Sequence, residues 1–482
     1  MNINKMKNFV QAYWEFLLIS IGLSLLVVNS LNHIFFWDTV QLGAKHATFF
    51  YENDLAISFL PNNIDSGHIP TFGYLLAVLW TVFGKSLWIS HLFILPFALG
   101  IAWQLQLLVL RFFQRKYLIW VLIIIFLDTT LLSQISLVSP DVPLLFFFLL
   151  AINSLAKRSK WRIAFAFSCL FLISLRGMIL TVPLFLFEVI WFWNKQENAK
   201  NRLVQLIKTG IPYLPAAFIF LVFSYYHFLQ KGWIGYHENS PWAVFFEKVS
   251  FQGLIKNTFI FGWRIIDFGR LFVWLVGLIT IVIVGVPQLR KSTQFKQLLL
   301  LFGLIIGFLA IPAMIYTDLK GHRYFMPVYI TFSLLVLFVL LELNNSTRWK
   351  RVGVSILILG LISGSFWVYP KSVAQGWDST LAHLPYYSLR QSMVNYMNKN
   401  KMDKESIGFD FPGAYSQKYL DLSENTWSFP EVDFGKQEYI LYSNVVNEFT
   451  DNELTELETK WEVVHVESYS TVQLILYRKK QE

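Results

Sequence analysis

The chain has 482 residues, of which 55% are hydrophobic and only 15% are charged. A soluble domain carries about a quarter charged residues, so the composition excludes an ordinary soluble protein. The formal net charge of +9 does not indicate a nucleic-acid partner, because most basic residues lie in short loops between apolar segments. The single cysteine, Cys169, lies within an apolar segment, which excludes an intramolecular disulfide and a cysteine metal cluster.

Apolar runs recur from the N-terminus to about residue 369, and each is about long enough to cross a hydrocarbon core of roughly 30 Å. We predict an α-helical polytopic membrane protein with eleven transmembrane helices. No cleavable signal peptide is expected, since the first apolar segment is long and no small-residue cleavage site follows it. The predicted spans are residues 16–36, 87–110, 117–136, 141–156, 162–177, 178–194, 209–229, 270–288, 297–317, 325–343 and 352–369.

Basic residues determine the predicted orientation. If the N-terminus is cytoplasmic, Lys and Arg cluster in the short inner loops, whereas the longer outer segments carry fewer of them. The odd number of spans then places the C-terminal segment outside, and a cytoplasmic (inner) membrane is the simplest location. In the outer loop 37–86, the apolar stretch 74–84 predicts a helix that lies in the membrane interface.

The composition changes after Pro370, where the chain becomes polar and mixed. Residues 451–460 are typical of a helix, and 438–444, 461–468 and 472–478 are rich in the β-branched and aromatic residues of strands. The sequence therefore predicts a transmembrane domain over residues 1–370 and a small extracytoplasmic α/β domain over residues 371–482.

Charged residues from four separate segments are expected to converge on the outer face. Asp38 closes the first span, Asp141 begins the fourth between two prolines, Arg176 ends the fifth, and Arg323 precedes the tenth. A single such acid is most often a helix-terminal residue in the headgroup zone. Charge at a membrane edge is costly without water or a partner, however, so the convergence of four favours an active site.

Carboxylates and arginines at an outer face indicate group transfer from a lipid phosphate. Outside the cytoplasm an activated sugar must arrive on a lipid carrier, such as a polyprenyl phosphate. A carboxylate could take the proton of an attacking hydroxyl, and arginines could stabilise the departing phosphate. The acids could also hold a divalent metal, but the arginines can already neutralise the phosphate, so the sequence assigns no cofactor.

Five motifs occur in order on the predicted outer face, over about residues 30–335. They are WDTVQLGAKHATFFYEND, DSGHIPTFGYLLAVLWTVFGK, SPDVPLLFFFLLAI, SLRGMILTVP and GHRYFMPVYI. This ordered set resembles the GT-C membrane glycosyltransferases, specifically the protein O-mannosyltransferase and lipid A aminoarabinose transferase group (glycosyltransferase family 39-like). The resemblance implies a GT-C fold and transfer of a mannose-like monosaccharide from polyprenyl phosphate to a hydroxyl on a protein, lipid or glycan.

The resemblance also implies roles for individual residues. It assigns catalytic roles to Asp38 and Asp141, donor-phosphate contacts to Arg176, Arg323 and Tyr324, and a pocket wall to His68. The chain departs from the group at Thr39, where many relatives have a second acid, and at Ile69, within the element that is usually H-P-P.

Two further acids are candidate pocket residues. Asp65 lies three residues before His68, and the two could bind a metal on one side of a helical turn, although loop capping is favoured because two ligands do not make a site. Asp128 lies within the third predicted span. It could face a wet cavity or a partner, or be satisfied locally by Thr129 and Ser133, and both interpretations stay open.

The alternative function is a transporter or flippase of lipid-linked sugars. Such a protein needs polar residues through the membrane rather than at one face, and Asp128 and Glu188 are the residues that the sequence offers there. A non-catalytic scaffold for the C-terminal domain would leave the acids and arginines of the outer face unexplained.

Overall fold

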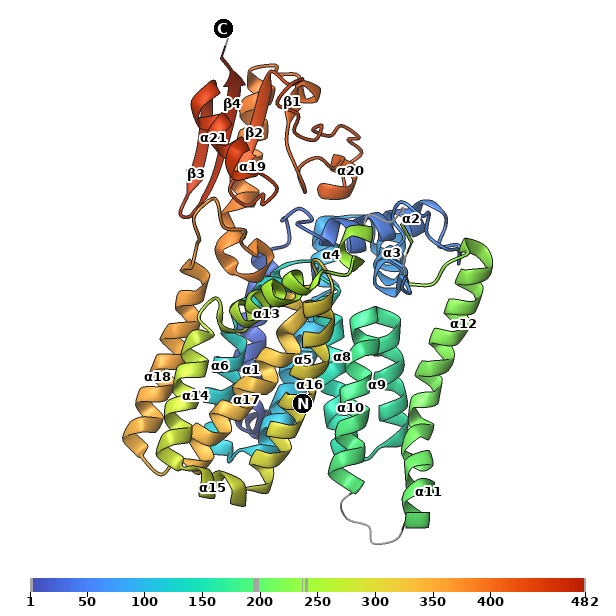
Figure 1. Cartoon of the computed structure of the whole chain (residues 1–482), viewed down its shortest axis with the longest axis vertical. Coiled ribbons are helices and arrows are strands. Elements are labelled where there is room, and N and C mark those ends of the chain that lie inside the picture. Colours follow the sequence, from blue (N-terminus) through green and yellow to red (C-terminus); the bar gives the residue numbers. More distant parts are fainter. Residues whose placement is uncertain (1–2, 194–198, 236, 239–241, 481–482) are drawn as a thin grey trace.

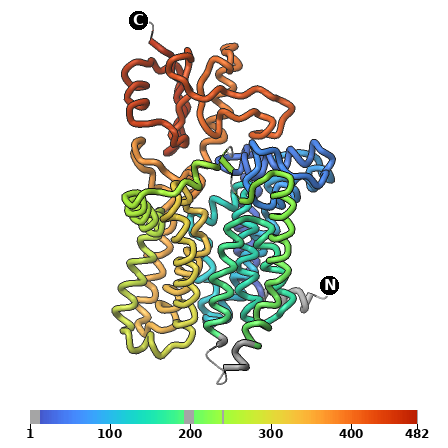
Figure 2. Tube along the Cα trace, turned by 45° about the vertical axis from the view of Figure 1, so that its right-hand side comes forward, coloured from blue at the N-terminus to red at the C-terminus, as the bar shows by residue number. Residues whose placement is uncertain are grey.

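The structure is a computed structural model that describes residues 3–193, 199–235, 237–238 and 242–480. Its long helices form a bundle with a small sheet beyond one end, and the C-terminus lies on that sheet (Figure 1). The first helix is α1 (Ile3–Asn29), and Figure 2 shows the sheet beyond the same end of the bundle from another side.

Within the described residues, five helical segments are long and apolar enough to cross a membrane, or up to seven if two bent pairs each count as one span. The five segments are Leu87–Phe112, Val204–Lys231, Thr293–Ile315, His322–Leu343 and Thr347–Phe366. The bent pairs are Arg115–Phe126 with Thr129–Ser136, and Phe251–Ile266 with Leu271–Val284. These segments identify an integral membrane protein, whereas the number of eleven spans stays a prediction.

The helices of the bundle overlap the predicted spans, but α1 ends at Asn29 rather than at residue 36, and a bend between two helices divides the predicted span 117–136. Those after α1 are α4 (Leu87–Leu92), α5 (Leu95–Phe112), α6 (Leu118–Phe126), α7 (Thr129–Ser136), α8 (Asp141–Lys157), α9 (Lys160–Ile173), α10 (Leu175–Trp193), α11 (Ala199–Gly210) and α12 (Leu214–Lys231). They continue with α13 (Phe251–Ile266), α14 (Leu271–Val284), α15 (Val286–Lys291), α16 (Thr293–Ile315), α17 (Met326–Phe338) and α18 (Thr347–Ser363). Figure 1 shows α13 lying across the end of the bundle that faces the sheet.

The loop after α1 forms two short helices at the same end, α2 (His46–Glu52) and α3 (Thr71–Phe83) (Figure 1). The predicted interfacial helix is α3, which buries Phe72, Leu76 and Trp80 and exposes large apolar residues near its end. Gly73 permits the close approach of α3 to α2, since a Cβ atom there would lie 2.4 Å from the Cβ atom of His46.

The C-terminal region contains a four-stranded sheet with the order β1-β2-β4-β3. The strands are β1 (Ile407–Gly408), β2 (Tyr439–Ser443), β3 (Trp461–Tyr469) and β4 (Val472–Lys479), with the helices α19 (Pro385–Lys399), α20 (Gln417–Leu420) and α21 (Asp451–Lys460). Strand β1 is parallel to β2, and the other pairs are antiparallel. Alternate residues of β4 face opposite sides, so Leu474 and Leu476 pack with α19 while Ile475 and Tyr477 pack with α21.

The membrane helices and the C-terminal region share buried contacts. Phe36, in the loop after α1, and Leu137, at the end of α7, belong to the same apolar cluster as Tyr386 and Met393 of α19. The sheet region is therefore packed onto the end of the bundle at the point where the predicted outer-face acids lie. The division of the chain at residue 370 stays a prediction.

Candidate active site

Four segments that are far apart in sequence meet at this end of the bundle. Asp38 follows α1 and precedes the π-helical turn Val40–Lys45, and Asp141 is the first residue of α8. Arg323 lies in the 3₁₀ turn before α17, and Asp378 lies in the 3₁₀ turn Trp377–Ser379 after α18. The structure thus brings together three of the predicted residues and adds one acid that sequence reasoning missed.

Arg323 is the centre of this group. Its Nη2 contacts Asp38 Oδ2, its Nη1 contacts Asp378 Oδ2, and its Nε lies 3.4 Å from Asp141 Oδ2. Only 8% of Arg323 is exposed, so carboxylates from three segments neutralise a buried guanidinium. A buried charge is costly unless it is paired, so these contacts fix the relative positions of the four segments.

Tyr324 lies against both arginines of the site. Its ring centroid is 4.2 Å from the Arg176 guanidinium carbon and 4.9 Å from that of Arg323, and both distances are typical of cation–π contacts. Arg176 also contacts Asp141 Oδ1, and Arg323 Nη2 donates to the Tyr324 hydroxyl at 3.1 Å. All five residues predicted for catalysis and donor phosphate therefore form one contact group.

The acids of this group differ in accessibility. The side chain of Asp38 is 31% exposed, whereas those of Asp141 and Asp378 are 2% and 6% exposed. Asp38 also lines a cavity of about 930 Å³, which is near the upper end of the range for ligand pockets. Of these three acids, Asp38 is therefore the one best placed to meet a substrate.

The cavity lies between α13, the start of the first outer loop and the C-terminal region. Its lining includes Trp37, Asp38, Gln41, Lys256, Arg264, Asp318, Lys320, His322, Arg323, Tyr324, Asp378, Phe411, Tyr415, Glu431 and Glu448. Cations predominate on the α13 side, and two glutamates lie on the C-terminal side. A substrate in the cavity can thus meet Asp38, cationic side chains and aromatic rings at once.

Two opposite charges on the loop before Arg323 lie in this wall. Burial raises the pKa of Asp318 and lowers the pKa of Lys320, and each shift is lessened by the charge of the other residue. Lys320 Nζ donates to Asn257 Oδ1 of α13 at 3.0 Å, which joins this loop to α13. The wall next to Arg323 is therefore held by polar contacts rather than by apolar packing.

A buried network also supports the turn that carries Arg323. His322 Nε2 lies 2.9 Å from Asp267 Oδ2, and the Tyr369 hydroxyl donates to Asp267 Oδ1 at 2.5 Å. The backbone amide of Phe268 donates to the same oxygen at 2.8 Å. Asp267 therefore joins the α13–α14 bend, the Arg323 turn and the segment after α18.

Asp65 and His68 lie in the loop between α2 and α3. Asp65 is buried, and its carboxylate accepts from Gly67 N at 2.9 Å and lies 3.1 Å from His227 Nε2 of α12. Burial lowers the pKa of His68 to about 4, and the nearby Arg176 charge acts in the same direction. Asp65 therefore has the favoured loop-capping role, while His68 is neutral at pH 7 near Arg176.

Asp128 lies between α6 and α7 and caps α7, with a bend of 68° between the two helices. Its carboxylate accepts from the backbone amides of Thr130 and Leu131, both at 3.1 Å, and from Arg270 Nε and Nη2, both at 2.8 Å. The partner that satisfies it is therefore Arg270 of the α13–α14 bend, and Asp128 is not among the residues that line the 930 Å³ cavity.

The described residues contain no group of three or more His, Cys, Asp or Glu side chains that could hold a metal ion. The acids around Arg323 are bridged by guanidinium groups instead. Sequence reasoning missed Asp378, which stands among ordinary polar residues, and Arg270, which begins the predicted span 270–288 and was not distinguished from a charge at the edge of a membrane helix. One signal was present for Asp378, which follows the last span shortly after its end, as Asp38 follows the first.

No protein-family model matches the chain, and no curated protein matches it in sequence. Among solved structures, the chain is similar to ArnT from Cupriavidus metallidurans bound to undecaprenyl phosphate, with 13% identity and a TM-score of 0.49. The similarity covers 97% of this chain and 98% of that chain. The apo state of the same protein gives 12% identity, the same TM-score and the same coverage.

Proposed function

We propose that the chain is a glycosyltransferase that moves a monosaccharide, mannose-like in its chemistry, from a polyprenyl-phosphate carrier to a hydroxyl acceptor on a protein, lipid or glycan. The contact between Asp38 and Arg323 at the wall of the 930 Å³ cavity carries this proposal. A carboxylate and a guanidinium in contact at a membrane edge supply the two groups that displacement of a lipid phosphate needs.

The reaction divides between the two groups. Asp38 takes the proton of the acceptor hydroxyl as that oxygen bonds to the anomeric carbon of the sugar. The bond between this carbon and the phosphate oxygen breaks, and the polyprenyl phosphate leaves with the electron pair. Arginine stabilises the negative charge that grows on the departing phosphate, because its planar fork matches phosphate geometry.

The donor phosphate contacts are assigned to Arg176, Arg323 and Tyr324. Arg176 is partly exposed and contacts one carboxylate, whereas each nitrogen of Arg323 is already engaged by a carboxylate. A guanidinium has five donors, so Arg176 keeps more of them free for a ligand. Arg176 is therefore the primary phosphate contact, and Arg323 joins the phosphate side of the site to Asp38.

We place the chain in the cytoplasmic membrane with the N-terminus inside and the C-terminal region outside, because Lys and Arg cluster in the short loops that this orientation puts on the cytoplasmic side. In that orientation the cavity opens on the outer face, where lipid carriers are the source of activated sugars. The rival, a flippase, would use polar groups within the membrane. Asp128 pairs with Arg270, and Glu188 accepts from the Tyr213 hydroxyl at 2.8 Å, so both acids have structural partners.

The purified chain should release polyprenyl phosphate from one member of a panel of polyprenyl-phosphate sugars, in a manner that depends on Asp38. Asp38→Asn keeps the size of the side chain and removes the base, and exposed Asp54→Asn is its matched control. A parallel reaction with a chelator tests whether release requires a divalent metal ion. If Asp38→Asn released polyprenyl phosphate as fast as the wild type, Asp38 would not be the base. Movement of intact donor between the leaflets, without release of polyprenyl phosphate, would favour the flippase.

A further inference from the structure

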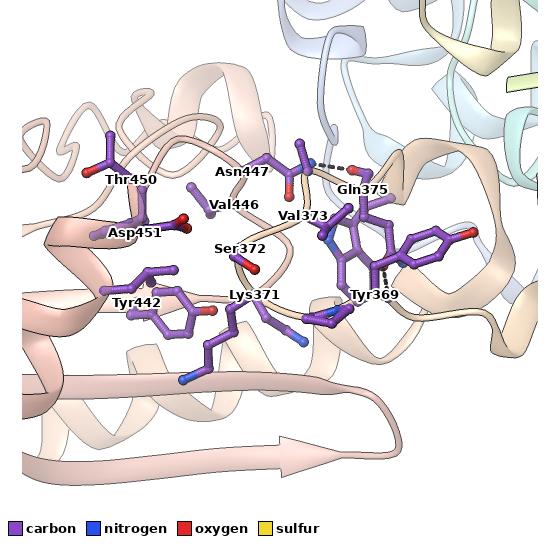
Figure 3. Close-up of a pocket in the computed structure, with 16 residues that line it drawn as sticks. Tyr369, Lys371, Ser372, Val373, Gln375, Tyr442, Val446, Asn447, Thr450 and Asp451 are labelled. Carbon is purple, nitrogen blue, oxygen red and sulfur yellow. Dashed lines mark hydrogen bonds between the residues drawn. The ribbon is translucent and has the colours of Figure 1, made fainter. Parts of the chain in front are cut away.

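A second cavity, of about 230 Å³, lies between the segment that follows the last membrane helix and the sheet region (Figure 3). One side consists of residues 369–375 and Trp377, and the other includes Tyr442 of β2, Asn447 and the start of α21. We call it the outer pocket. It is smaller than the roughly 300–1,000 Å³ of pockets for drug-sized ligands, so it suits a single ring-sized group.

The outer pocket contains two buried donors that lack partners. Gln375 is 3% exposed and Trp377 is 1% exposed. Among the described residues, Gln375 Nε2 and Trp377 Nε1 have no hydrogen-bond partner, although Gln375 Oε1 accepts from Tyr369 N at 2.8 Å. Buried polar groups are nearly always satisfied, so these donors favour a ligand that presents acceptor oxygens.

The remaining lining disfavours an anionic ligand, because the one acid among its described residues, Asp451 at the start of α21, adds negative charge and its one cation is already paired. Lys371 Nζ lies 3.2 Å from Glu458 Oε1 and 5.3 Å from the Tyr442 ring centroid, so its charge is already balanced. Tyr369, Tyr442 and Phe449 supply aromatic surface. A sugar ring is complementary to such a lining, because its C–H groups can pack on aromatic rings and its hydroxyl and ring oxygens can accept hydrogen bonds.

The outer pocket adjoins the 930 Å³ cavity. Ala374, Gln375 and Asn447 line both, and Asn447 Nδ2 donates to the Gln375 carbonyl between them (Figure 3). Gln375 lies three residues before Asp378, and three residues of fully extended chain span at most about 11 Å. A ligand in the outer pocket is therefore close enough for an adjoining unit to reach the acid group around Arg323.

We infer that the outer pocket binds a neutral sugar unit of a glycan acceptor, so that the adjoining unit presents its hydroxyl to Asp38. This inference rests on the proposed transfer reaction for its biological use, but sugar binding in the pocket is measurable without a donor. It narrows the acceptor class from protein, lipid or glycan to a glycan.

The test is saturation-transfer NMR on the full chain in detergent, without donor. The probes are mannose, galactose, N-acetylglucosamine, their short oligosaccharides and serine-containing peptides. Ser372→Trp fills the mouth of the outer pocket, and Ser468→Trp places the same side chain on an exposed position of β3. Gln375→Glu keeps Oε1 for Tyr369 N and removes the unpartnered donor. Thermal unfolding checks that each variant is folded.

We expect an oligosaccharide to bind the wild type and Ser468→Trp with equal affinity. Its affinity for Ser372→Trp and for Gln375→Glu should be at least tenfold lower. No sugar binding, equal binding by Ser372→Trp and Ser468→Trp, or binding of peptides in place of sugars would overturn the inference. The proposed function fails separately, if the wild type cleaves no donor. If sugars bound in the outer pocket but no donor were cleaved, the outer pocket would still be a glycan-binding site, and the proposed transferase activity would be rejected.

Discussion

The guanidinium of Arg323 donates a hydrogen bond to the carboxylate of Asp378, although 55 residues and two membrane helices, α17 and α18, separate them in the chain. The backbone carbonyl of Asp378 accepts from Ser133 Oγ and Gln134 Nε2, both at 2.8 Å. The segment after the last membrane helix is therefore fixed both to α7 and to the central arginine. The C-terminal region thereby contributes an acid to the site that Asp38 and Asp141 occupy.

Asp378→Asn should lower both stability and transfer. Arg323 keeps two of its three carboxylates, so the cost is that of one charged hydrogen bond, about 1.5–3 kcal/mol, rather than that of an unpaired buried charge. Thermal unfolding of the purified variant measures the first effect, and polyprenyl-phosphate release measures the second. An unchanged unfolding temperature would mean that the contact does not contribute to the folded state.

Arg176→Ala should raise the KM for the lipid-linked donor by roughly 10- to 100-fold, the equivalent of one lost charge-assisted hydrogen bond. Arg176→Lys keeps the positive charge next to Asp141 and should keep most donor use. Steady-state kinetics with varied donor separates KM from kcat. A fall in kcat alone, with the KM of the wild type, would mean that Arg176 positions Asp141 and does not bind the phosphate.

Local sequence patterns were sufficient to predict much of the fold and part of the candidate site. Enrichment in β-branched and aromatic residues predicted β2, β3 and β4, and α21 occupies the 10 residues that were predicted for it. Asp38, Asp141 and Arg323 were found because each stands at the end of an apolar run. An acid or arginine at a span end is a signal that one segment alone can give.

Partners across segments were not predictable, because they depend on which span ends meet. Arg270 and Asp378 have their roles only through contact with Asp128 and Arg323. The bend at Asp128 within the predicted span 117–136 was not predicted, because hydropathy does not register a side chain that caps the second helix. The helix α19 was also missed, because its buried residues alternate with polar ones in a mixed segment.

Gly73→Ala should destabilise the first outer loop. The added Cβ atom would lie 2.4 Å from the His46 Cβ atom, and overpacking of this kind costs about 1–3 kcal/mol. Gly303→Ala, in α16, is the matched control, because its Cβ atom would meet no described atom within 4 Å. Thermal unfolding should rank the control at or above the wild type, and Gly73→Ala below it. Equal unfolding temperatures would show that α2 and α3 can separate at no cost.

His383 should make the packing of the C-terminal region sensitive to acid. Burial lowers the pKa of His383 from 6.5 to about 4, and its ring stacks on Phe36 at 5.1 Å between centroids. Between pH 6.5 and pH 4 the unfolded chain therefore binds a proton that the folded chain does not, so stability falls as the pH falls through this window. The loss at pH 4 is on the order of 3 kcal/mol, because each pKa unit is worth about 1.4 kcal/mol.

This acid sensitivity is measured by thermal unfolding at intervals from pH 7 to pH 4. His383→Gln should lessen the dependence of the unfolding temperature on pH, because the variant has no ring to protonate at position 383, while His68 keeps its lowered pKa. His465→Gln changes a partly exposed histidine that lies 3.0 Å from Glu467 Oε1, and it should retain the slope of the wild type. If His383→Gln kept that slope as well, the acid sensitivity would come from other groups, and the contact of His383 with Phe36 would not be the point at which the C-terminal region loosens.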